Sequence, residues 1–259
     1  NKSLHQIIQL EKEGKAEQKL SSTDKLITIY GIAKGMSFLH SHDVIHSNLK
    51  TENIIVDDNN NPYITDYAIS QIEHDVFSKK TIESASKIHG TVSYLPPEFF
   101  KDFKYTKQGD VYAFAMIVYE LLTKEKPFGK EDHSKIVKKV TKGARPKINT
   151  TLPKVYLNLI EKCWDQKPSN RPTFDQIVDL LKTDSNFITK RVDKEKYFSY
   201  IESLSNKKSD NDKSKSDNDT KVTKTKSEPI IDKKSDNETA VTTKKAKSAK
   251  LIKDDDDGN

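Results

Sequence analysis

His46-Ser47-Asn48-Leu49-Lys50-Thr51-Glu52-Asn53 forms a polar segment that runs directly into two short apolar runs. The runs cover residues 53–56 and 62–65, and the aspartates and asparagines between them, at residues 57–61, are typical of a turn. The pattern therefore predicts a hairpin-like pair of strands immediately after the polar segment.

Helices are predicted on both sides of this hairpin. Upstream, apolar residues recur at helical spacing over residues 25–41, with Ser22, Thr23 and Asp24 as N-cap candidates. Downstream, the same spacing predicts helices near residues 111–123, 133–141, 154–164 and 174–182. Residues 70–87 are polar and aperiodic, and they predict a long loop, which inside a compact domain is usually functional or disordered.

Four further motifs follow the polar segment in a fixed order. They are Asp66-Tyr67-Ala68, the run Gly-Thr-Val-Ser-Tyr-Leu-Pro-Pro-Glu at residues 90–98, Asp-Val-Tyr-Ala-Phe-Ala at residues 110–115, and Cys163-Trp164 with Arg171-Pro172. Together with residues 46–53 they resemble the protein kinase family, whose catalytic loop reads His-Arg-Asp-Leu-x-x-x-Asn and is followed by Asp-Phe-Gly and Ala-Pro-Glu. The Cys-Trp ending resembles the tyrosine-kinase-like group, for which the family expectation is Ser/Thr specificity.

The resemblance implies an α+β, mainly α-helical fold, namely a kinase C-terminal lobe over residues 1–183. Residues 1–4 resemble the stretch just after the hinge between lobes, so we expect the N-lobe, with its glycine loop and strand lysine, upstream of residue 1. A C-terminal extension is expected at residues 184–204. Residues 205–259 are rich in Lys, Ser and Asp, and they predict a disordered low-complexity tail.

Three residues carry the family's expected nucleotide chemistry. By resemblance, Asn53 and Asp66 would bind Mg²⁺, which prefers oxygen ligands, and Lys50 would contact the phosphates of ATP and steady the transferring phosphoryl group. The alternative for the first two is purely local, with Asn53 capping a turn and Asp66 ending a strand.

The departures from the family pattern concern the catalytic position itself. Asn48 stands where the family has the aspartate that accepts the substrate proton, and a carboxamide cannot act as a base at neutral pH. Ser47 replaces the arginine that pairs with a phosphorylated activation loop, and Ala68 replaces a glycine. These changes predict impaired phosphotransfer; sequence drift in a working enzyme is the alternative.

Other motif residues are expected to be structural. By resemblance, Glu98 and Arg171 form an ion pair that ties the activation segment to the lobe, and Asp110 caps its helix and anchors the catalytic loop. His46 is expected to pack beneath that loop. Cys163 has no neighbouring His or Lys to activate a thiolate, so we expect a core residue.

Composition and charge narrow the classes of molecule that this chain is expected to bind. The net charge of +6 comes from lysines interspersed with acidic residues, which favours a solvated surface over nucleic-acid binding. No run reaches the roughly 18 apolar residues that a membrane helix needs. We therefore expect a protein partner or protein substrate and a cytoplasmic, intracellular location, with the oligomeric state left open.

Two functions from different classes follow. The first is a pseudokinase that acts in signalling as a scaffold or regulator. The second is a Ser/Thr protein kinase that binds ATP and is weakly active when joined to an N-lobe. A non-functional gene fragment is a third, weaker interpretation.

Overall fold

A computed structural model describes residues 2–17, 19–67, 92–149 and 151–216. The chain divides into two compact units, Asn1–Asp212 and Lys213–Asn259, and the first contains every element that builds the site. The predicted loop at residues 70–87 and the predicted tail beyond residue 216 lie outside the described residues.

The first unit contains a small, three-stranded antiparallel sheet. It has the strand order β1 (Lys2–Ser3), β2 (Ile54–Val56) and β3 (Pro62–Ile64), with Ile55 opposite Tyr63. The turn between β2 and β3 is organised by Asp57, whose carboxylate accepts hydrogen bonds from the backbone N–H groups of Asn59 and Asn61 at 2.9 and 2.8 Å. The predicted hairpin is confirmed, whereas β1 was not predicted.

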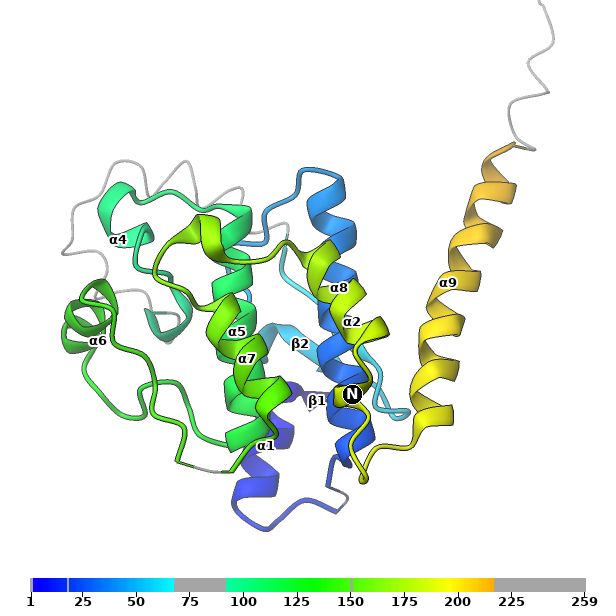
Figure 1. The fold of residues 1–259 in the computed structure, drawn as a ribbon, viewed down its shortest axis with the longest axis horizontal. Helices are drawn as coiled ribbons and strands as arrows, with labels where there is room; N and C mark the ends of the chain where they lie inside the picture. The colour runs from blue at the N-terminus through cyan, green and yellow to red at the C-terminus, as the bar shows by residue number, and fades with distance from the viewer. Residues whose placement is uncertain (1, 18, 68–91, 150, 217–259) are drawn as a thin grey trace, which may run out of the picture. The chain divides into compact units, whose positions relative to one another are not determined.

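Helices make up most of the described chain (Figure 1). The α-helices are α1 (Leu4–Lys12), α2 (Ser22–Ser41), α4 (Phe99–Asp102), α5 (Lys107–Thr123), α6 (His133–Thr141), α7 (Lys154–Cys163), α8 (Phe174–Thr183) and α9 (Lys194–Ser216). Short 3-10 turns are η1 (Thr51–Asn53), η3 (Val92–Tyr94), η4 (Pro168–Asn170) and η5 (Ser185–Phe187). The predicted α+β, mainly α-helical fold is confirmed.

Helix α5 forms the centre of the hydrophobic core. It contacts α2, α7 and α1, and Tyr112, Phe114 and Ile117 on different faces are completely buried. A helix that is apolar all round is stable only when surrounded by other elements. In Figure 1, α5 lies beside α7 accordingly. Within the described residues, no helix combines the length and the apolar character needed to cross a bilayer.

Helix α5 begins earlier than predicted, and Asp110 does not cap it. The N-cap is Thr106, whose hydroxyl oxygen accepts a hydrogen bond from the Gly109 N–H at 3.0 Å. Residues 107–109 are not apolar, so the periodic pattern missed the first turn. Asp110 lies within that turn, and its carboxylate contacts other parts of the chain.

The start of α2 also differs from the prediction. Its N-cap is Ser21, and Asp24 occupies the third helical position, where the two side chains each bond the other residue's N–H in a capping box. Helix α1 was not predicted at all. It begins with the same device, because Ser3 and Gln6 exchange side-chain to backbone bonds at 3.2 and 2.9 Å.

The C-terminal extension packs on the same unit through α9. Tyr197 and Ile201 of α9 are buried, and the Lys196 ammonium lies 2.7 Å from the Asp24 carboxylate in α2. Residues 205–216, expected to start the disordered tail, continue this helix. Once the packed part has nucleated a helix, each further residue adds a backbone bond at little additional cost.

Candidate functional site

The backbone at the start of the loop at residues 46–53 is hydrogen-bonded to one buried carboxylate, that of Asp110. Asp110 is 2 % exposed, and its two oxygens accept hydrogen bonds from the backbone N–H groups of His46 at 2.8 Å and Ser47 at 2.9 Å. His40 Nε2 lies 2.9 Å from the same carboxylate. Ser47 adopts a left-handed backbone conformation, φ 60°, which is unusual for a residue other than glycine. Helix α5 therefore sets the backbone path of the loop.

The end of the loop is joined to the β2–β3 hairpin by Asn53. Its Nδ2 donates to the Asn48 carbonyl at 2.9 Å, and its own carbonyl accepts from the Thr65 N–H at 3.0 Å. Asn53 is almost completely buried. Because the amide nitrogen is engaged, the remaining side-chain atom, Oδ1, is the one available as a ligand.

Asp66 follows Thr65 directly, so it lies at the hairpin end to which Asn53 is bonded. Asp66 is exposed to solvent, and its backbone is left-handed, φ 62°, a conformation that aspartate tolerates. The pair thus offers one carboxamide oxygen and one carboxylate, both hard ligands that fit Mg²⁺. In the described part of the chain, no group of three or more His, Cys, Asp or Glu side chains is arranged for a metal.

Lys50 precedes the 3-10 turn η1, and its carbonyl accepts the Asn53 N–H at 3.0 Å. It is half-buried, and no carboxylate of the described residues pairs with its ammonium. Lys50, Asn53 and Asp66 are thus placed along one short stretch from the loop to the hairpin end. A lysine ammonium and two oxygen ligands are the group types that bind a metal-bound phosphate.

Asn48 lies within the same bonded loop. Its N–H donates to the His46 carbonyl at 2.8 Å, and its carbonyl accepts from Asn53. The ring of His46 is completely buried, and this burial lowers the pKa of His46, so the imidazole is neutral at pH 7. Asn48 carries no basic group, and the His46 ring is shielded from solvent, so neither residue offers a base to a substrate hydroxyl.

Glu98 and Arg171 meet in a two-pronged ion pair. Arg171 Nη1 lies 2.6 Å from Glu98 Oε1, and Nη2 lies 2.9 Å from Oε2. The arginine side chain is 0 % exposed and also donates to the backbone carbonyls of Asp165 and Gln108. This contact ties the segment before α4 to the chain before α8.

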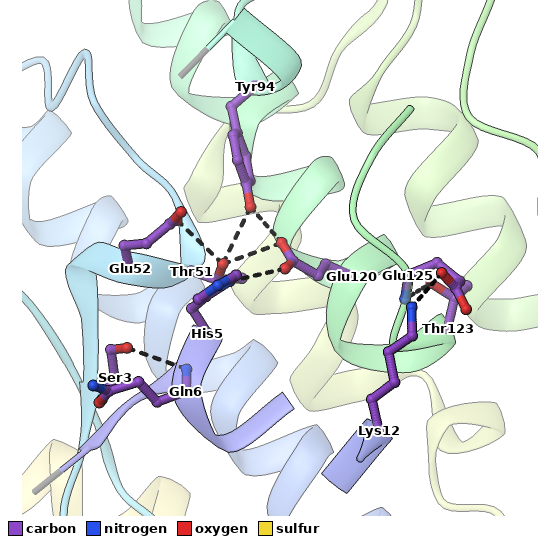
Figure 2. Close-up of polar contacts among 10 residues, drawn as sticks. All are labelled: Ser3, His5, Gln6, Lys12, Thr51, Glu52, Tyr94, Glu120, Thr123 and Glu125. Carbon is purple, nitrogen blue, oxygen red and sulfur yellow. Dashed lines mark hydrogen bonds and ion pairs between the residues drawn. The ribbon is translucent and has the colours of Figure 1, made fainter. Parts of the chain in front are cut away.

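A second polar cluster was not predicted from the sequence (Figure 2). Glu120 of α5 is completely buried, and it accepts hydrogen bonds from the hydroxyls of Tyr94 and Thr51, the latter at 3.1 Å. His5 of α1 lies 3.3 Å from its other oxygen. The one local signal was Glu120 itself, a carboxylate inside an otherwise apolar run.

A family model described as protein tyrosine and serine/threonine kinase matches residues 2–181, and the chain therefore belongs to this protein kinase family.

Three relatives from Dictyostelium discoideum carry the name serine/threonine-protein kinase. A probable one from Dictyostelium discoideum is 37 % identical over 153 residues, which is 58 % of this chain and 16 % of that protein. RGS domain-containing serine/threonine-protein kinase A from the same organism is 34 % identical over 164 residues, covering 63 % and 14 %. A probable LIM domain-containing kinase is 32 % identical over 195 residues, covering 73 % and 29 %. The chain thus spans less than a third of the length of each of these relatives.

Proposed function

We propose that this chain is the C-terminal lobe of a tyrosine-kinase-like protein kinase domain that acts in signalling as a pseudokinase, a scaffold or regulator with impaired phosphotransfer. The observation that carries the proposal is Asn48, a carboxamide at the position where the family has its catalytic aspartate, in a loop whose backbone is anchored on both sides. Asp110 and Asn53 hold the backbone around it. The loss is therefore one of charge and basicity, while the positioning of the loop is retained.

The missing carboxylate has a predictable cost. A positioned general base typically contributes about 10²–10⁴-fold to the rate of a proton-transfer step. Neutral asparagine has no lone pair basic enough for this role at pH 7. The ring of His46 is completely buried and therefore cannot reach a substrate hydroxyl, so it does not replace the lost base.

Nucleotide binding is the part of the family chemistry that these residues still support. Kinases of this family use ATP with Mg²⁺, which supplies positive charge that neutralises the phosphates. Asn53 Oδ1 and the Asp66 carboxylate would hold the ion, and Lys50 would contact phosphate. Since these residues cover only part of a nucleotide, we expect an affinity no better than about millimolar, roughly 4 kcal/mol of binding free energy.

The alternative is a Ser/Thr protein kinase that is weakly active when joined to an N-lobe. It is favoured by the retention of Lys50, Asn53 and Asp66 in this sequence. In either case the expected macromolecular partner is a protein, and the expectation of an intracellular, cytoplasmic location stays a prediction that rests on the family.

A phosphotransfer assay separates the two functions when the chain is joined to the N-lobe of an active kinase, because the alternative expects activity only in that form. Labelled ATP, Mg²⁺ and a mixed Ser/Thr peptide pool are incubated with this fusion and with its Lys50→Ala and Asn48→Asp variants. We expect the unchanged fusion to transfer no more phosphate than Lys50→Ala. Transfer by the unchanged fusion that Lys50→Ala abolishes would refute the pseudokinase proposal and support the alternative. A gain in Asn48→Asp alone would assign the defect to the missing carboxylate.

A further inference from the structure

Three charged contacts join α1 to the C-terminal end of α5 and the residues after it. They are His5 with Glu120 at 3.3 Å, Glu11 with Lys124 at 2.8 Å, and Lys12 with Glu125 at 2.6 Å. Histidine is the only one of these side chains that changes charge near neutral pH in its ordinary state. The first contact therefore differs from the other two in its response to protons.

The same contact is the one that reaches the 46–53 loop. Glu120 Oε1 faces His5, while Glu120 Oε2 accepts from Thr51 of η1 and Tyr94 of η3 (Figure 2). Thr51 Oγ1 and Tyr94 Oη also lie 3.1 Å apart. Three segments that are distant in sequence thus meet at one carboxylate, and Thr51 lies between Lys50 and Asn53 of the candidate site.

The charge balance at Glu120 depends on His5. Glu120 is completely buried, and a buried carboxylate is costly unless it is paired and hydrogen-bonded. The titratable groups facing His5 are Glu120 from α5, Glu52 from η1 and Lys126 after α5. The two carboxylates favour the cationic ring, and the lysine opposes it.

The pKa of His5 is accordingly raised above its ordinary value, mainly by the hydrogen bond to Glu120 and against the opposing effect of burial. Tyr94 keeps its own phenolic proton and does not titrate with His5, because burial and the adjacent Glu120 carboxylate raise the pKa of Tyr94 well above its usual range. The His5 side chain is 30 % exposed, so the ring can exchange protons with solvent.

We propose that His5 is a pH-dependent positioning residue for the 46–53 loop, which it acts on through Glu120 and Thr51. Protonated His5 neutralises Glu120 and holds α1, η1 and η3 together. Loss of the proton leaves a neutral ring beside a buried anion and loosens the turn that carries Asn53. Since the folded state raises the pKa of His5, its stabilisation is complete below the unfolded pKa and is lost as pH rises through the folded pKa.

Amide hydrogen exchange on the full chain tests this directly, at about pH 5.5 and about pH 8 on either side of the histidine titration. After correction for intrinsic exchange rates, we expect the backbone amides of residues 51–56 to be protected several-fold more at the lower pH. Helix α7 serves as the internal reference because it contains no histidine and contributes no residue to the cluster. The readout requires no nucleotide or phosphotransfer, so failure of the proposed function leaves it intact.

Three variants complete the test. His5→Phe should abolish the pH dependence at residues 51–56, and His5→Lys, which stays charged, should keep protection high at both pH values. Lys12→Met removes a neighbouring contact between α1 and Glu125 and should retain the wild-type pH dependence. The proposal is overturned if His5→Phe still shows the wild-type dependence, or if Lys12→Met loses it equally.

Discussion

Replacing Arg171 by alanine should destabilise the chain strongly. The guanidinium binds both Glu98 oxygens, at 2.6 and 2.9 Å, from a side chain that is 0 % exposed. Breaking a buried ion pair by removing one partner costs about 3–5 kcal/mol. Glu98 is 20 % exposed, so water relieves part of this cost.

Two further acceptors raise the expected loss again. Arg171 donates to the backbone carbonyls of Asp165 and Gln108 at 2.9 and 3.0 Å, and an acceptor left unsatisfied costs about 1–3 kcal/mol. The relief at the partly exposed Glu98 and the two unsatisfied carbonyls act in opposite directions, so we expect a net loss of about 3–5 kcal/mol, against the roughly 5–15 kcal/mol by which folded domains are stable.

Urea unfolding followed by the fluorescence of the single tryptophan, Trp164, measures this loss. Arg145→Ala is the matched control. Its guanidinium also lies 5.1 Å from the Tyr112 ring centroid, as that of Arg171 does, but it pairs with no carboxylate of the described residues. A midpoint for Arg171→Ala that equals the wild-type value, or that of Arg145→Ala, would refute the reasoning.

Two other predictions concern the packing. Gly31→Ala should lower the free energy of unfolding by about 1–3 kcal/mol through overpacking, because a Cβ there would lie 2.5 Å from both Pro62 Cγ and Tyr200 Oη. Thermal unfolding checks this against Gly109→Ala, whose Cβ would meet nothing closer than 3.4 Å, and equal melting temperatures would contradict it. Cys163 is completely buried, and burial raises the pKa of its thiol, so a disulfide reagent should label it only after unfolding in urea; rapid labelling of the native chain would show this to be wrong.

Local patterns were enough for most of the secondary structure. The helix at residues 133–141 and the hairpin around Asp57 were predicted from spacing and turn residues, because both are stabilised by contacts close in sequence. The family was also identifiable from motif order alone. Helix α1 was missed although Ser3 and Gln6 carried its capping signal and Leu4, Ile7 and Ile8 fall at helical spacing, since the helix spans only nine residues.

The arrangement of the site was decided by contacts between distant residues. The bond from His5 to Glu120 joins positions 115 apart, and the bonds from Asp110 reach the loop across more than 60 residues. No local periodicity encodes such pairs, because they form only when α1, α5 and the loop pack together. The candidate ligand residues and the anchoring role of Asp110 could thus be expected from the family motifs, whereas the buried Glu120 and its partners His5, Thr51 and Tyr94 emerged only from the tertiary structure.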